Sequence, residues 1–72
     1  MMHAHMPIHP DELRTIDDQI SVGEERISEQ KDSVARLKQE GLDATAAREM
    51  LLILQNSQSL LISRRNLLLR QS

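Results

Sequence analysis

The sequence contains no cysteine and no phenylalanine, tyrosine or tryptophan. The lack of cysteine excludes disulfides and thiolate metal sites, and it fits a reducing compartment. The lack of aromatic rings removes the stacking platforms used by single-strand nucleic-acid binders, and it leaves a core of aliphatic residues, which suits helices better than sheets. Only two glycines and two prolines interrupt the 72 residues, so we expect a few long helices.

Dense positive charge and long apolar runs are also missing. The net charge of −2 divides into −4 over residues 11–40 and +2 over residues 41–72, with no basic cluster typical of nucleic-acid binding. No apolar run approaches the roughly 18 residues needed to span a bilayer. The N-terminus lacks the charged-then-apolar order of a signal peptide. These features predict a cytoplasmic protein that binds neither nucleic acid nor membranes.

Helical periodicity begins after the first nine residues, which are predicted to form a flexible tail. Pro10 suits a first helical position, and the acidic residues after it suit a first turn. Apolar residues then recur at alternating intervals of three and four up to about residue 40, as on a helix with one narrow buried seam. The seam positions are Leu13, Ile16, Ile20, Gly23, Ile27, Gln30, Val34 and Leu37.

A short turn at residues 41–43 is predicted to separate this helix from a second one at about residues 44–70. Gly41 can adopt the left-handed conformation that ends a helix, and Asp43 is a good N-cap. A link this short forces the helices to lie antiparallel. The predicted fold class is therefore all-α, an antiparallel two-helix hairpin that occupies residues 10–72.

The second helix is more apolar than one narrow partner stripe can cover. Its seam holds Ala47, Leu51, Leu54, Gln58, Leu61, Arg65 and Leu68, and further apolar residues lie beside the seam. Because large exposed apolar patches mark interfaces, we expect a homodimeric four-helix bundle with the second helix at its centre. The predicted interface consists of Met50, Ile53, Leu54, Leu60, Leu61, Leu67 and Leu68.

Opposite charges favour the antiparallel arrangement. Folding about residue 42 places acidic residues at the start of the first helix near arginines at the end of the second. Exposed pairs contribute only about 0–1 kcal/mol each, so we expect them to set orientation more than stability. The residues concerned are Asp11, Glu12, Asp17 and Asp18, and Arg64, Arg65 and Arg70.

Gly23, Gln30 and Gln58 are the positions that depart from the apolar pattern, and we interpret them as register and packing residues. Gly23 predicts a close helix approach opposite Leu60 or Leu61; the alternative is a hinge or docking notch. Gln30 is expected to face Leu54, Gln55 and Gln58 in a polar layer that fixes register; the alternative is a ligand or partner site.

Catalytic and cofactor sites are not predicted. The histidines are confined to the tail, and Ser57, Ser59 and Ser63 have no histidine near them in the sequence or across the expected hairpin. His3, together with a free amine and two backbone amides, is a weak candidate for a square-planar Cu²⁺ or Ni²⁺ site; the alternative is a tail without a metal site.

The pattern from Ile20 to Arg65 resembles a group of short uncharacterised helical proteins of alphaproteobacteria. This resemblance implies a hairpin and no particular activity. It rests on Ile20, Gly23, Glu24, Ile27, Gln30, Ala35-Arg36-Leu37, Gly41-Leu42-Asp43-Ala44, Ala47-Arg48, Leu51-Leu52 and Arg65.

A second resemblance is weaker. Ser57-Gln58-Ser59-Leu60-Leu61 is similar to the start of the Ser-Gln-Glu-Leu-Asp motif of sporulation-type aspartyl-phosphate phosphatases. Leu61 stands where that family has its acidic residue, so the resemblance carries no catalytic residue to this chain.

Three functions remain open from the sequence. The first is a non-enzymatic oligomerisation or protein–protein interaction module. The second is a small regulator that docks on a helix of a kinase, receiver or transcription complex. The third is a metal-binding N-terminal tail.

Overall fold

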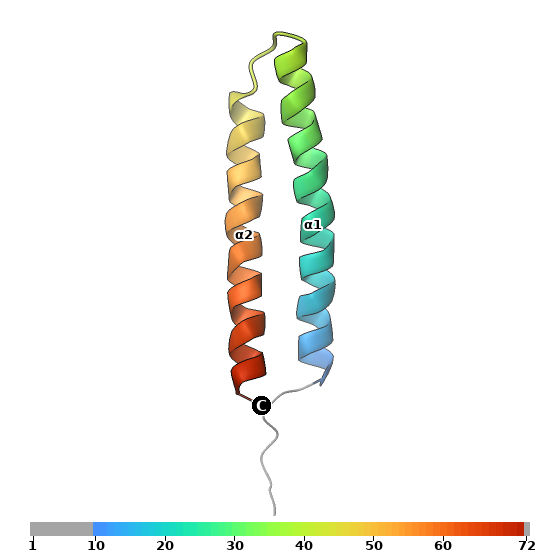
Figure 1. Ribbon diagram of the computed structural model, residues 1–72, viewed down its shortest axis with the longest axis vertical. Helices are drawn as coiled ribbons and strands as arrows, with labels where there is room; N and C mark the ends of the chain where they lie inside the picture. The colour runs from blue at the N-terminus through green and yellow to red at the C-terminus, as the bar shows by residue number, and fades with distance from the viewer. Residues whose placement is uncertain (1–9, 72) are drawn as a thin grey trace, which may run out of the picture.

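Two long α-helices, side by side and antiparallel, make up the computed structural model, which describes residues 10–71 (Figure 1). Helix α1 spans Pro10–Gln39 and helix α2 spans Thr45–Arg70. The all-helical hairpin expected from the sequence is confirmed, whereas the predicted tail at residues 1–9 lies outside the described residues. At 1.5 Å per residue, the 30 residues of α1 extend over about 45 Å.

The polar residues at the ends of α1 are favourable for a helix. Asp11 and Glu12 lie in the first turn, where the partial positive charge of the helix dipole attracts carboxylates. Arg36 and Lys38 lie in the last turn, where the dipole favours positive charge. Their placement gives α1 defined ends although its apolar stripe is narrow.

Helix α1 ends in a Schellman motif centred on Gly41. The N–H of Leu42 donates to the carbonyl oxygen of Leu37 at 2.8 Å, and the N–H of Gly41 donates to that of Lys38 at 3.1 Å. Gly41 has a φ of 71°, in the left-handed region, as the sequence predicted. The motif occupies carbonyls that would otherwise lack helical partners, and it turns the chain toward α2.

Substitution of Gly41 should destabilise the hairpin only through the strain of the left-handed backbone conformation, because a Cβ there would meet no atom within 4 Å. The left-handed conformation costs roughly 1–2 kcal/mol for an L-residue, so Gly41→Ala should lower the free energy of unfolding by about that amount in urea titrations. Gly41→Asn should lose less, because asparagine tolerates this conformation better. Equal losses for alanine and asparagine would contradict the backbone explanation.

The start of α2 differs by one residue from the prediction. Ala44, not Asp43, occupies the N-cap position, and its carbonyl oxygen accepts the first helical bond from the N–H of Arg48 at 2.9 Å. Asp43 acts one position earlier: its Oδ1 accepts from the N–H of Thr45 at 2.9 Å and from Thr45 Oγ1 at 2.7 Å. These bonds to Thr45 lower the pKa of Asp43 from its ordinary value of 3.8.

The buried apolar residues are few and lie toward the two ends of the hairpin. Ile16 is buried near the open end, and Val34 and Ala44 are buried near the turn. Between them the buried residue is polar, Gln58. Among residues 11–71, no large side chain is completely buried. The hairpin therefore has a thin core, as expected of two helices without a third layer.

Candidate functional site

The predicted seams are the faces along which the two helices meet. Every seam position predicted for α1 and α2 is buried or half-buried in the structure. The seven predicted interface residues divide into two groups by exposure. Leu54, Leu61 and Leu68 are half-buried on the α2 seam, whereas the other four are exposed.

The exposed four form one apolar row on α2, which we call the α2 stripe. It consists of Met50, Ile53, Leu60 and Leu67, whose exposed fractions are 46%, 59%, 72% and 48%. Ile53, Leu60 and Leu67 are seven residues apart, so they repeat on one side of the helix about every 10 Å. A single hairpin leaves this stripe uncovered.

Other large apolar residues are exposed but less regularly placed. Val22 is the one exposed large apolar residue on α1 within the described residues, and the exposed Leu42 lies in the turn. Leu52, Ile62 and Leu69 are exposed on α2 outside the α2 stripe. Helix α2 therefore carries most of the exposed aliphatic surface, while its partner helix is mainly polar on the outside.

An open groove borders the part of the α2 stripe that holds Leu60 and Leu67, on the side that faces α1. Leucines from α2 form one wall of the groove, and Val22 and Gly23 contribute from α1. Sequence reasoning did not identify Val22 and Arg26 as groove residues, although Val22 is the isolated apolar residue beside the α1 seam. The full lining consists of Asp18, Gln19, Val22, Gly23, Arg26, Leu54, Ser57, Gln58, Leu60, Leu61, Ser63, Arg64 and Leu67.

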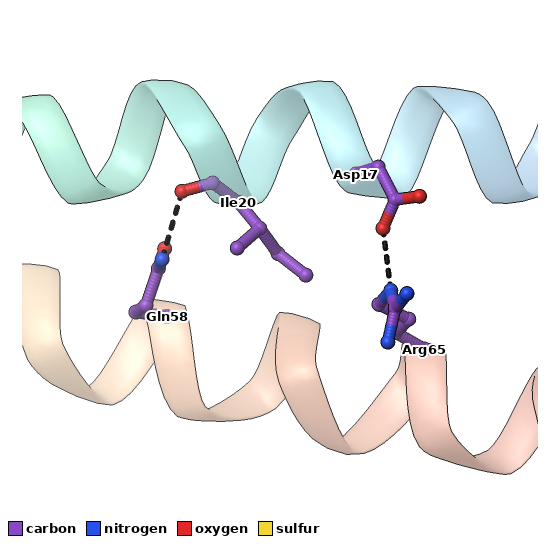
Figure 2. A network of polar contacts seen from close by, with 4 residues as sticks. All are labelled: Asp17, Ile20, Gln58 and Arg65. Carbon is purple, nitrogen blue, oxygen red and sulfur yellow. Dashed lines mark hydrogen bonds and ion pairs between the residues drawn. The ribbon is translucent and has the colours of Figure 1, made fainter.

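Gly23 permits a close contact with the side chain of Gln58. A Cβ added at Gly23 would lie 2.0 Å from Oε1 and 2.9 Å from Cδ of Gln58. In the space that glycine leaves, Gln58 Nε2 donates to the backbone carbonyl oxygen of Ile20 at 2.8 Å (Figure 2). The residue nearest the added Cβ is thus Gln58, and not Leu60 or Leu61 as the sequence suggested.

Gln30 makes a similar contact, but from a side chain of α1 to the backbone of α2. Its Nε2 donates to the backbone carbonyl oxygen of Ala47 at 3.0 Å. Gln30 and Ile20 are ten residues apart on α1, or about 15 Å at 1.5 Å per residue, so the two contacts are separate. Gln30 lies beside Leu54 in a small open pocket, as expected. The expected common layer of Gln30 with Gln58 is wrong, because each glutamine instead bonds to a backbone carbonyl of the other helix.

An ion pair joins the helices near their open end. Arg65 Nε lies 2.5 Å from Asp17 Oδ1 (Figure 2). This contact confirms the predicted attraction between the acidic start of α1 and the basic end of α2. Both side chains remain more than a third exposed, so solvent screening keeps the contribution of the pair near 0–1 kcal/mol.

Within residues 10–71, no group of three or more His, Asp or Glu side chains is placed to hold a metal ion. The candidate His3 lies outside the described residues. No helix in the described part of the chain is long and apolar enough to cross a membrane.

Comparisons of this chain with protein-family models, with curated proteins and with solved structures find no significant match. The similarity to short alphaproteobacterial helical proteins therefore stays a prediction from the sequence. The α2 stripe and its groove are the features that bear on function.

Proposed function

We propose that this protein is a non-enzymatic oligomerisation module that works as a homodimeric four-helix bundle. The observation that carries the proposal is the exposure of the α2 stripe, Met50, Ile53, Leu60 and Leu67, beside a groove. Burial of an exposed Leu or Ile side chain is favourable by roughly 1.5–3 kcal/mol, so association has a strong driving force.

The thin core gives a second reason for association. No large side chain among residues 11–71 is completely buried in the hairpin, and chains below about 70–80 residues commonly depend on oligomerisation for stability. A second copy supplies an identical apolar row on a helix of the same length, so each stripe covers the other. A closed pair of this kind leaves neither stripe in water.

The test is the oligomeric state of the full chain and of a variant with a charged stripe. Sedimentation equilibrium should show a dimer at micromolar concentration. Ile53→Glu combined with Leu60→Glu should weaken it by about 100-fold or more, because two aliphatic contacts are lost and tenfold corresponds to 1.4 kcal/mol. A wild-type chain that is monomeric at such concentrations would contradict the proposal.

The matched control is Ser59→Glu combined with Asn66→Glu, which adds the same charge at exposed polar positions of α2 outside the stripe. This control should remain dimeric. If the double glutamate variant at the stripe loses its helical circular dichroism, Leu60→Gln is the second test, since glutamine retains helix propensity. A dimer of undiminished affinity in Leu60→Gln and in the stripe variant would place the interface elsewhere.

A further inference from the structure

The proposed dimer has two candidate arrangements, because the stripe of one copy could meet either helix of the other. Helix α1 offers a poor partner: Val22 is its one exposed large apolar residue in the described part of the chain. Helix α2 offers an apolar row equal to the first. Contact between α2 and the same helix of the second copy therefore buries the most apolar surface.

Charge then selects the direction in which the two α2 helices run. Near the start of α2 the charges of Arg48 and Glu49 offset each other, whereas Arg64, Arg65 and Arg70 lie near its end, Arg65 being paired with Asp17 of its own copy. A parallel pair brings six arginines together at one end of the bundle. An antiparallel pair keeps the two arginine-rich ends at opposite ends of the bundle, and it also opposes the two helix dipoles.

The stripe also indicates where the two helices cross. It extends from Met50 to Leu67, so an antiparallel pair that overlaps both stripes has its two-fold axis between Ser57 and Leu60. In that register Met50 meets Leu67 of the second copy. Leu60 meets Ser57, a small residue that lines the groove next to Gln58 and Gly23.

We propose that two copies pack with α2 antiparallel to α2, so that Leu60 of each copy enters the groove beside Gly23 and Ser57 of the other. Leu60 is 72% exposed, more than any other large apolar residue in the described chain, and the groove beside it has apolar walls and small residues at Gly23 and Ser57. The surface is self-complementary, as a two-fold interface requires. This inference rests on the proposed dimer, and it adds the partner face, the direction and the register.

Disulfide trapping tests the arrangement, because the native chain contains no cysteine and a single introduced thiol is therefore the only one. Ala46→Cys and Gln71→Cys are suitable, since both residues are exposed and lie just beyond the two ends of the stripe. In the proposed register, residue 46 of one copy lies opposite residue 71 of the other. In the proposed register, two copies of residue 46 lie about 37 Å apart along the helix direction, far beyond disulfide reach.

The two variants are unfolded together, refolded as a mixture, oxidised and analysed by intact mass spectrometry. We expect the heterodisulfide between residues 46 and 71 to form, while each variant alone gives only background disulfide. Abundant homodisulfides of residue 46 and of residue 71 would show a parallel pair. No disulfide from any combination, in samples that sedimentation shows to be dimeric, would also overturn the arrangement.

Failure of this inference is distinguishable from failure of the proposed function. Sedimentation of the same cysteine variants under reducing conditions reports dimer formation without regard to orientation. A dimer that forms the wrong disulfides refutes the antiparallel packing and leaves the oligomerisation module intact. A monomer under reducing conditions refutes both.

Discussion

Ile16→Ala is expected to remove a large part of the free energy of unfolding of the hairpin, about 2–5 kcal/mol. Ile16 is one of three buried apolar residues among residues 11–71, with an exposed fraction of 4%. Replacement of a buried isoleucine by alanine typically costs 2–5 kcal/mol, because burial is lost and a cavity remains. A chain of this length has a total stability of roughly 4–11 kcal/mol at 0.05–0.15 kcal/mol per residue. Urea titration monitored by circular dichroism measures the loss.

The control for this substitution is Leu52→Ala. Leu52 is 60% exposed and lies outside the α2 stripe, so its truncation should change the free energy of unfolding by less than about 0.5 kcal/mol. Similar losses at Ile16 and Leu52 would show that the seam between α1 and α2 does not carry the stability of the hairpin.

Gly23→Leu should destabilise the hairpin by about 2 kcal/mol. The Cβ alone would overlap Oε1 of Gln58, so the glutamine must leave its bond to the Ile20 carbonyl, and the rest of the leucine must find space between closely packed helices. Overpacking of this kind typically costs 1–3 kcal/mol, and loss of the hydrogen bond costs about 1 kcal/mol more. The roughly 1 kcal/mol by which leucine exceeds glycine in helix propensity offsets part of this. Thermal and urea unfolding measure the difference, with the oligomeric state determined on the same samples.

A double variant, with a larger residue at Gly23 and a smaller one at Gln58, tests whether steric overlap between these two positions causes the loss. Gln58→Ala removes the side chain that meets position 23, so the double variant should recover most of the stability lost in Gly23→Leu. Contacting residues commonly show coupling free energies of 0.5–3 kcal/mol. Ser21→Leu, at an exposed position of the same helix, should be nearly neutral. Additive losses in the double variant would mean that Gln58 is not what limits the space at Gly23.

The sequence was sufficient to predict which side of each helix is buried, because burial follows helical periodicity. Intervals of three and four put Leu13 and Leu37 on the same face although they are 24 residues apart, and both are half-buried. The turn could be predicted equally well, since Gly41 is one of two glycines and the left-handed conformation strongly favours glycine. The helix ends at Gln39 and begins again at Thr45, each within one residue of the predicted bounds.

Side-chain partners across the hairpin could not be predicted in the same way. Periodicity places Gln30 and Gln58 on the seam, but a glutamine can reach along the neighbouring helix and bond to a backbone carbonyl as well as to another side chain. The structure shows bonds to the carbonyls of Ala47 and Ile20 instead of a shared layer. Prediction of these contacts needs the relative height of the two helices, which the length of the turn fixes only to within a few residues.

The backbone acceptors of the two glutamines affect how this chain can change during evolution. A carbonyl is present whatever side chain its residue carries, so Ile20 and Ala47 can be substituted without removal of the acceptor. Substitution of Gln58 or Gln30 does remove its hydrogen bond, because the donor is the side-chain amide of the glutamine itself. Selection on these contacts therefore acts on one helix at a time. Paired substitutions, the usual sign of contact between two positions, should be absent at Ile20–Gln58 and at Gln30–Ala47 and should instead link Gly23 with Gln58.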